Sequence, residues 1–129
     1  MSVLLRHHRS ETADRLAEIL RDLQAQPEIE QVHLATDDGI PIEFAAYQDG
    51  KAGVVAGFIL AAARQGFGML ALGPVSEITI REEFGRLFVS NAFSVGESWL
   101  VLTLVFHKDM PYKRLVNQTI ADIVSTVEK

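Results

Sequence analysis

The segment 53–73, GVVAGFILAAARQGFGMLALG, is the longest apolar run of the chain, and Arg64 is its only charged residue. Its length suits a membrane span, because about 20 apolar residues cross the hydrocarbon core of a bilayer. However, Arg64 and Gln65 fall in the middle of the run, at the depth where a charge costs most. We therefore interpret the segment as part of a long helix over 51–72 that is buried almost all round, and we expect no membrane span.

Length and composition narrow the class of protein. The chain has 129 residues and fits one domain, so we expect a flexible N-terminus over 1–10 and a single domain over 11–129. An apolar content of 48% is high for a monomer of this size and indicates an interface. The net charge of −5 argues against nucleic acid as a partner, because binding to phosphates depends on Lys and Arg.

Signatures of enzymes and metal sites are missing. The chain has no cysteine, which excludes disulfides and thiol chemistry, and with no export signal we expect a cytoplasmic protein. GESWL (96–100) has only the first half of a nucleophile elbow, and no phosphate-binding or HExxH motif occurs. Asp37 and Asp38 suit a turn, and the histidines lack the spacing of metal ligands. We expect no catalytic residue, no metal and no cofactor.

Amphipathic helices are predicted near both ends of the chain. Ser10 can cap a helix that begins at Glu11, after which apolar residues recur at helical spacing. Asp109 and Pro111 open a final helix. The apolar face of that helix contains Val116, Ile120, Ile123, Val124 and Val127.

Alternating or continuous apolar runs predict five strands. Asp38-Gly39 lies between the first two runs and is typical of a hairpin turn, and Pro41, which cannot donate to a ladder, places the second strand at an edge. The run 98–106 is almost wholly apolar, which favours a strand covered on both faces in the middle of the sheet. The predicted strands are 31–36, 40–44, 75–81, 86–92 and 98–106.

These elements predict an α/β (α+β) fold in the order α-β-β-α-β-β-β-α. Two amphipathic helices can cover one face of a five-stranded antiparallel sheet, and the long helix can cover the other. The result is an α/β/α sandwich.

Small residues form a stripe along the long helix. Its bulky apolar residues span roughly 240° of the circumference, whereas one sheet face covers about 100°. A glycine inside a helix costs about 1 kcal/mol relative to alanine, so the stripe indicates close approach of another backbone. We interpret that backbone as a second copy related by a two-fold axis; packing under loops of the same chain is the alternative. The stripe contains Gly53, Gly57, Ala61, Arg64, Gly68 and Ala71.

The order of elements and several stretches resemble the Roadblock/dynein light-chain (LAMTOR-like) family, with its profilin-like fold. The resemblance covers about residues 11 to 128, and Gly66-Phe67-Gly68 late in the long helix departs from it. Within the family the chain is similar to the prokaryotic MglB-like type. The stretches are ATDDGIPIEF (35–44), VAG (55–57), ITIREEFGRLFV (78–89) and WLVLTLVF (99–106).

The resemblance implies that two protomers join through the long helix and strand 75–81 to form a continuous ten-stranded sheet. It also implies a Ras-like small GTPase as partner, as for the prokaryotic members, whereas eukaryotic members are scaffolds for GTPases or dynein. The residues expected at the dimer interface are Gly53, Gly57, Phe58, Ala61, Val75, Ile78 and Ile80. Those expected to bind the GTPase are Arg64, Gln65 and Gly68.

Arg64 has three interpretations: a solvated arginine beside the interface, a contact to the partner, or an arginine finger inserted into a GTPase site. We expect a homodimeric, non-enzymatic regulator or scaffold of a Ras-like small GTPase, with modulation of nucleotide hydrolysis as one form of regulation. The alternatives are a structural assembly subunit and a sensory module that holds a small ligand between the sheet and the helices.

Overall fold

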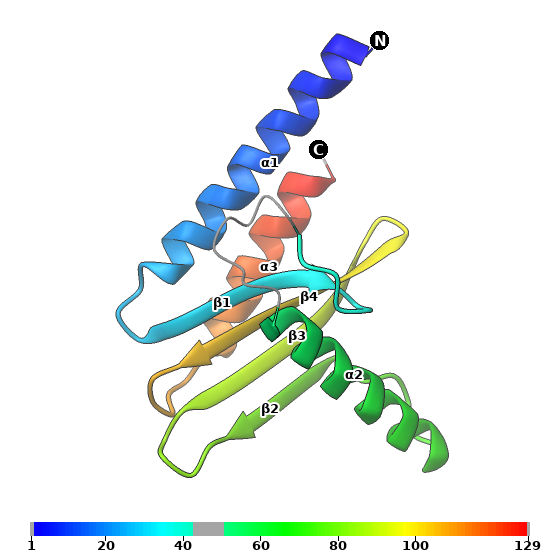
Figure 1. Ribbon diagram of the computed structural model, residues 1–129, viewed down its shortest axis with the longest axis vertical. Coiled ribbons are helices and arrows are strands. Elements are labelled where there is room, and N and C mark those ends of the chain that lie inside the picture. The colour runs from blue at the N-terminus through cyan, green and yellow to red at the C-terminus, as the bar shows by residue number, and fades with distance from the viewer. Residues whose placement is uncertain (1, 43–50, 129) are drawn as a thin grey trace.

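The computed structural model describes residues 2–42 and 51–128, with side chains over 11–42 and 54–128 (Figure 1). Within these residues, three helices and four strands follow one another in the order α1-β1-α2-β2-β3-β4-α3. Their bounds are α1 Ser2–Gln24, β1 Ile29–Thr36, α2 Lys51–Met69, β2 Glu77–Arg81, β3 Leu87–Val95, β4 Ser98–Phe106 and α3 Lys113–Val127.

The four strands form one antiparallel sheet in the order β1-β4-β3-β2. The apolar strand β4 lies between β1 and β3, which confirms the interior position predicted for 98–106. Across this part of the sheet, Thr103 of β4 opposes His33 on one side and Ser90 on the other. The short strand β2 ends the sheet, so the residues that follow α2 lie at an edge.

The prediction of a five-stranded sheet was wrong for the described part of the chain. The Asp-Gly turn forms as predicted: the N–H of Gly39 donates to the carbonyl of Thr36 at 3.0 Å, and Gly39 has a φ of 90°. Beyond the turn, a short backbone pairing with β1 continues: the N–H of Thr36 donates to the carbonyl of Ile40 at 2.9 Å, and the N–H of Ile42 donates to the carbonyl of Leu34 at 3.0 Å. An isolated bridge joins Pro41 to Ala35 between these two bonds. Pro41 stands at the position between two hydrogen-bonded pairs, so its missing N–H costs no bond to β1. Residues 40–42 nevertheless form no regular strand. Residues 43 and 44 of this predicted strand lie outside the described residues.

Helices cover both faces of the sheet, as the sandwich prediction required. Figure 1 shows α1 and α3 side by side on one face and α2 alone on the other. The main core lies between the sheet and the α1–α3 pair, and a smaller cluster lies beneath α2. The side chains at the centre of the main core are Leu34, Leu87, Leu102, Leu104, Phe106 and Ile123. The smaller cluster consists of Leu60, Val75, Ala92 and Val101.

Helix α1 begins earlier than predicted. It starts at Ser2, so Ser10 lies inside the helix and caps nothing, and the predicted start at Glu11 was wrong. The stretch before Glu11 contains neither Gly nor Pro, so nothing local ends the helix there. The flexibility of 1–10 stays a prediction.

Helix α2 ends at Met69 rather than at residue 72. Ala71 adopts the left-handed conformation with a φ of 58°, and the N–H of Leu72 donates to the carbonyl of Phe67 at 2.8 Å. The N–H of Ala71 donates to the carbonyl of Gly68 at 3.1 Å, which completes a Schellman-type end. The helix therefore stops directly after the Gly-Phe-Gly step that departs from the family pattern.

Candidate protein-interaction surface

Helix α2 is buried on one side and exposed on the other within the single chain. The prediction of a helix buried almost all round is therefore not met by this chain alone. Ala56 and Leu60 face the sheet and are each 2% exposed. The bulky residues face away from it, with Phe58 75% and Met69 81% exposed. Small side chains let the helix backbone approach the sheet, and this orientation leaves the bulky arc outside. We call the exposed residues Val54, Val55, Phe58, Ala61, Ala62 and Met69 the outer face of α2.

The close backbone approach predicted for the glycine stripe occurs at Gly57, within a single chain. A Cβ at Gly57 would lie 2.9 Å from the Cα of Gly39 in the hairpin turn. The alternative of packing under the chain's own loops therefore explains this glycine without a second copy. Among the described residues, no heavy atom beyond the local chain lies within 4 Å of a Cβ at Gly66 or Gly68, so these glycines do not share the contact of Gly57. Gly53 lies in α2, in the part without described side chains.

Arg64 points toward the same turn. Its Nη1 lies 3.4 Å from Oδ2 of Asp37, and both side chains are partly exposed. The N–H of Asp37 in turn donates to the carbonyl of Trp99 at 3.2 Å. The ion pair thus ties the turn to α2, whereas Gln65 and Gly68 are exposed. No sequence pattern indicated this pair, because its members are 27 residues apart.

The residues expected on strand 75–81 separate into two groups. Val75 precedes β2 and is buried in the cluster beneath α2, so its side chain is covered by its own chain. Ile78 is half-buried and Ile80 is 43% exposed on the side of the sheet that α2 occupies. The surface available to a partner therefore combines the outer face of α2 with Ile78, Ile80 and the edge of β2.

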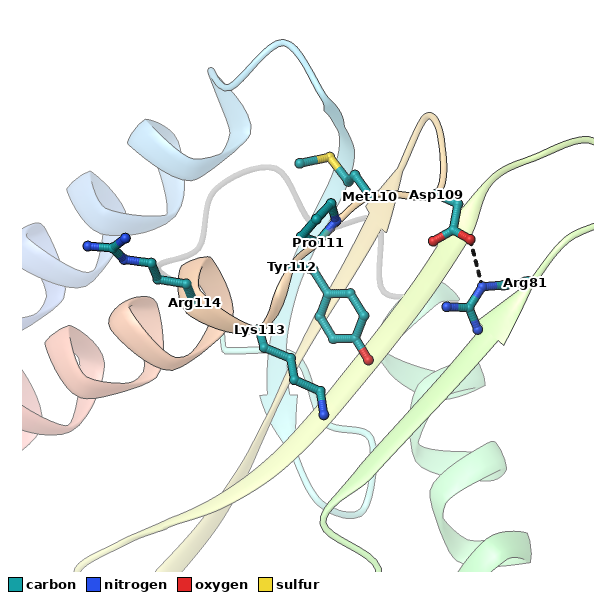
Figure 2. A pocket seen from close by; sticks show the side chains of 7 residues that line it. All are labelled: Arg81, Asp109, Met110, Pro111, Tyr112, Lys113 and Arg114. Atoms are coloured by element: carbon teal, nitrogen blue, oxygen red, sulfur yellow. Dashed lines mark hydrogen bonds and ion pairs between the residues drawn. The ribbon is translucent and has the colours of Figure 1, made fainter.

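Polar side chains hold the opposite side of β2. Tyr112, directly before α3, has its hydroxyl 2.8 Å from Oγ1 of Thr79 and 3.0 Å from Oε2 of Glu77. At the other end of the strand, Nε of Arg81 donates to Oδ2 of Asp109 at 2.8 Å (Figure 2). We call Asp109 and Tyr112 the clamp. They fasten a strand whose only strand partner among the described residues is β3.

The contacts around Glu77 change the pKa of its carboxyl. Burial raises its pKa, but hydrogen bonds from Tyr112, Asn91 and Thr79 and the charge of Lys113 oppose that effect. The net pKa lies below the ordinary value of 4.5, so the ionised form is the one that the clamp favours.

An open hollow of about 600 Å³ lies beside the clamp. Its cations do not converge on one point: Arg81 is paired with Asp109, and Figure 2 shows Arg114 extending away from both Arg81 and Tyr112. Such a lining does not define a small-ligand site. The residues that line it are Arg81, Asp109, Met110, Pro111, Tyr112, Lys113 and Arg114.

The residues with described side chains, 11–42 and 54–128, contain no group of three or more His, Asp or Glu that could hold a metal ion. No helix there has the length and apolarity to cross a bilayer.

The arrangement as a whole defines an α+β sandwich known from solved structures. It matches the Roadblock/LC7 domain from Streptomyces avermitilis with a TM-score of 0.63 and 14% identity, over 86% of this chain and 92% of that one. It matches the gliding protein mglB from Thermus thermophilus with a TM-score of 0.68 and 16% identity, over 91% of both chains. No family model and no curated protein matches the sequence. The chain therefore has the Roadblock/LC7 fold, as the sequence resemblance implied.

Proposed function

We propose that this protein is a homodimeric, non-enzymatic regulator or scaffold that binds a Ras-like small GTPase in the cytoplasm. The observation that carries the proposal is the outer face of α2, where Val54, Val55, Phe58 and Met69 are each more than half exposed. An apolar surface of this kind on a globular domain is typical of a protein interface. The fold, shared with a gliding protein and a Roadblock/LC7 domain, supports the same function.

The open edge of β2 supports dimerisation in particular. Unpaired strand edges template pairing with another chain, and the half-buried Ile78 and exposed Ile80 add apolar area beside it. A second copy can cover part of the outer face of α2 and the edge of β2 together. The GTPase then binds the remaining surface around Arg64, Gln65 and Gly68.

In this proposal the GTPase itself carries out the nucleotide hydrolysis. A protein without catalytic groups acts on a GTPase by favouring one of its conformations. The switch loops of Ras-like GTPases are ordered by the γ-phosphate and relax after hydrolysis, so binding depends on the nucleotide. We expect tighter binding to the form loaded with a GTP analogue than to the GDP form.

The test uses the full chain and a purified Ras-like GTPase encoded near its gene. Light scattering first measures the mass at about 100 μM, well above the dissociation constant of a tight dimer. Titration calorimetry then compares the two nucleotide forms. A monomer at this concentration contradicts the dimer. Equal affinities reduce the role to a scaffold, and no binding to either form favours the structural assembly subunit.

A further inference from the structure

The open edge of β2 presents main-chain groups at alternate residues. The carbonyl of Ser76, just before the strand, accepts from the N–H of Ala92 in β3 at 2.8 Å. Positions that bond to the neighbouring strand alternate with positions that do not in an antiparallel pair. The even-numbered residues of β2 therefore bond to β3, and the main-chain groups of Glu77, Thr79 and Arg81 point to the open edge.

The side chains of these outward-directed residues are already held in place. Tyr112 contacts both Glu77 and Thr79, and Asp109 contacts Arg81 through Nε. The clamp therefore orders the residues whose main chain an incoming strand would meet. A preorganised edge loses less conformational freedom on pairing than a loose one.

The sequence of β2, EITIR, is complementary to itself when reversed. In an antiparallel pair with its own copy, a two-fold axis places one residue opposite itself. With Thr79 at that position, Glu77 of each strand opposes Arg81 of the partner subunit. Isoleucines then oppose isoleucines on the side of the sheet that carries α2.

Other symmetric registers lack this match. Centring the pair on Ile78 places Glu77 opposite Thr79 of the partner subunit. Centring it on Ile80 places Glu77 opposite Glu83 of the partner subunit, and like charges directly opposite are destabilising. A register that places odd-numbered residues of one β2 opposite even-numbered residues of the other cannot form regular hydrogen bonds. The main-chain groups of the even-numbered residues are already directed to β3.

The family resemblance already implies that strand 75–81 pairs with its copy. For that pairing we infer the register centred on Thr79, with two ion pairs between Glu77 and Arg81 of the partner subunit across the two-fold axis. This inference rests on the proposed dimer and specifies its register. The Asp109 contact to Nε leaves the terminal nitrogens of Arg81 for the carboxylate of the second copy.

Cysteine cross-linking tests the register, since the chain has no cysteine of its own. In the inferred register Thr79→Cys faces its copy with Cα atoms about 5.5 Å apart, within the range of a disulfide. Ile78→Cys lies diagonally from its copy at about 7–8 Å, beyond easy bridging. We expect Thr79→Cys to form the covalent dimer at least about tenfold faster under mild oxidation. Faster cross-linking of Ile78→Cys overturns the register.

Charge reversal provides an independent test with an internal control. Glu77→Lys and Arg81→Glu each place like charges opposite one another in a homodimer, whereas a mixture of the two variants restores opposite charges at both positions. A given variant chain lacks the same contacts within its own fold whether it is in a homodimer or in the heterodimer. A difference in stability between homodimers and heterodimer therefore comes from the contact between copies.

Native mass spectrometry of the mixture measures the outcome. We expect the ratio of heterodimer to the two homodimers to exceed its statistical value by roughly tenfold, because two cross-strand pairs are restored. A statistical mixture from variants that remain dimeric overturns the register. A wild type that is monomeric by light scattering at the same concentration instead contradicts the proposed dimer itself, so the two failures are distinguishable.

Discussion

Gly57 of α2 packs directly against Gly39 of the hairpin turn, so closely that a Cβ at position 57 would lie 2.9 Å from the Cα of Gly39. Gly39 has a φ of 90°, a conformation that favours glycine. The two glycines let the turn lie on the helix backbone, and Arg64 fastens it there through Asp37. The turn and α2 therefore form one unit on one side of the sheet.

Gly57→Ala should destabilise the fold, because the added methyl group meets backbone that can move only by displacing the turn. We expect a loss of about 1–3 kcal/mol in the free energy of unfolding, measured by urea denaturation. Gly66→Ala is the matched control in the same helix, since nothing lies within 4 Å of its Cβ. It should be neutral or stabilising by up to about 1 kcal/mol. Equal losses for both variants would contradict the packing argument.

Arg64→Glu should weaken binding of the GTPase while leaving the dimer intact. The Arg64–Asp37 pair is partly exposed, so its loss should change the free energy of unfolding by less than about 1 kcal/mol. Asp37→Asn removes the same ion pair but keeps the arginine. If Arg64 contacts the partner directly, calorimetry should find little change in affinity for Asp37→Asn. An equal loss for both variants would mean that Arg64 acts by holding the turn.

Phe58→Arg should disrupt the dimer, because Phe58 is the aromatic residue of the outer face of α2 and is 75% exposed. Aromatic side chains near the centre of an interface commonly carry much of its binding energy, and we expect the dissociation constant to rise at least about tenfold. Light scattering over a dilution series measures the change. Phe84→Arg is the control, since Phe84 is 88% exposed but lies in the turn between β2 and β3. Equal effects would place the interface elsewhere.

The stabilising contribution of Glu77 should depend on pH. Its pKa in the folded protein is below 4.5, so the contribution is fully present above the unfolded value and is lost as the pH falls through the folded pKa. The difference in urea midpoint between wild type and Glu77→Gln should therefore be constant from about pH 7 to pH 5.5 and shrink below about pH 4.5. A difference that grows as the pH falls would have the wrong sign.

Tyr112→Phe tests the cause of this behaviour. Removing the hydroxyl leaves burial of the carboxylate less opposed, so the pKa of Glu77 should rise, as followed by NMR titration of its side-chain carboxyl. If the pKa of Glu77 is unchanged in Tyr112→Phe, its low value comes from Asn91, Thr79 and Lys113 instead.

Local features of the fold could be predicted well from the sequence. The bounds of β4 agree with the prediction for 98–106, because an almost continuous apolar run suits a strand covered on both faces. The Asp38-Gly39 turn and the amphipathic α3 also form where their patterns indicated. The resemblance correctly implied the Roadblock/LC7 fold, since it depended on the order of these elements.

The residues expected at the dimer interface do not all lie on one surface of the chain. Phe58 and Ala61 do lie on the outer face of α2, but Val75 is buried and Gly57 contacts the chain's own turn. The clamp was missed altogether, because its contacts join residues 28 and 35 positions apart and no spacing rule connects them.

The sequence by itself determined the central strand over 98–106, the final helix and the place of the hairpin turn, because neighbouring residues set those preferences. Only the tertiary structure decided which arc of α2 faces the sheet. Both arcs are apolar, so hydrophobicity did not distinguish them, and the smaller side chains of Ala56 and Gly57 permit the closer approach. That packing leaves Phe58 and Met69 exposed, so the proposed interaction surface lies on the bulky arc.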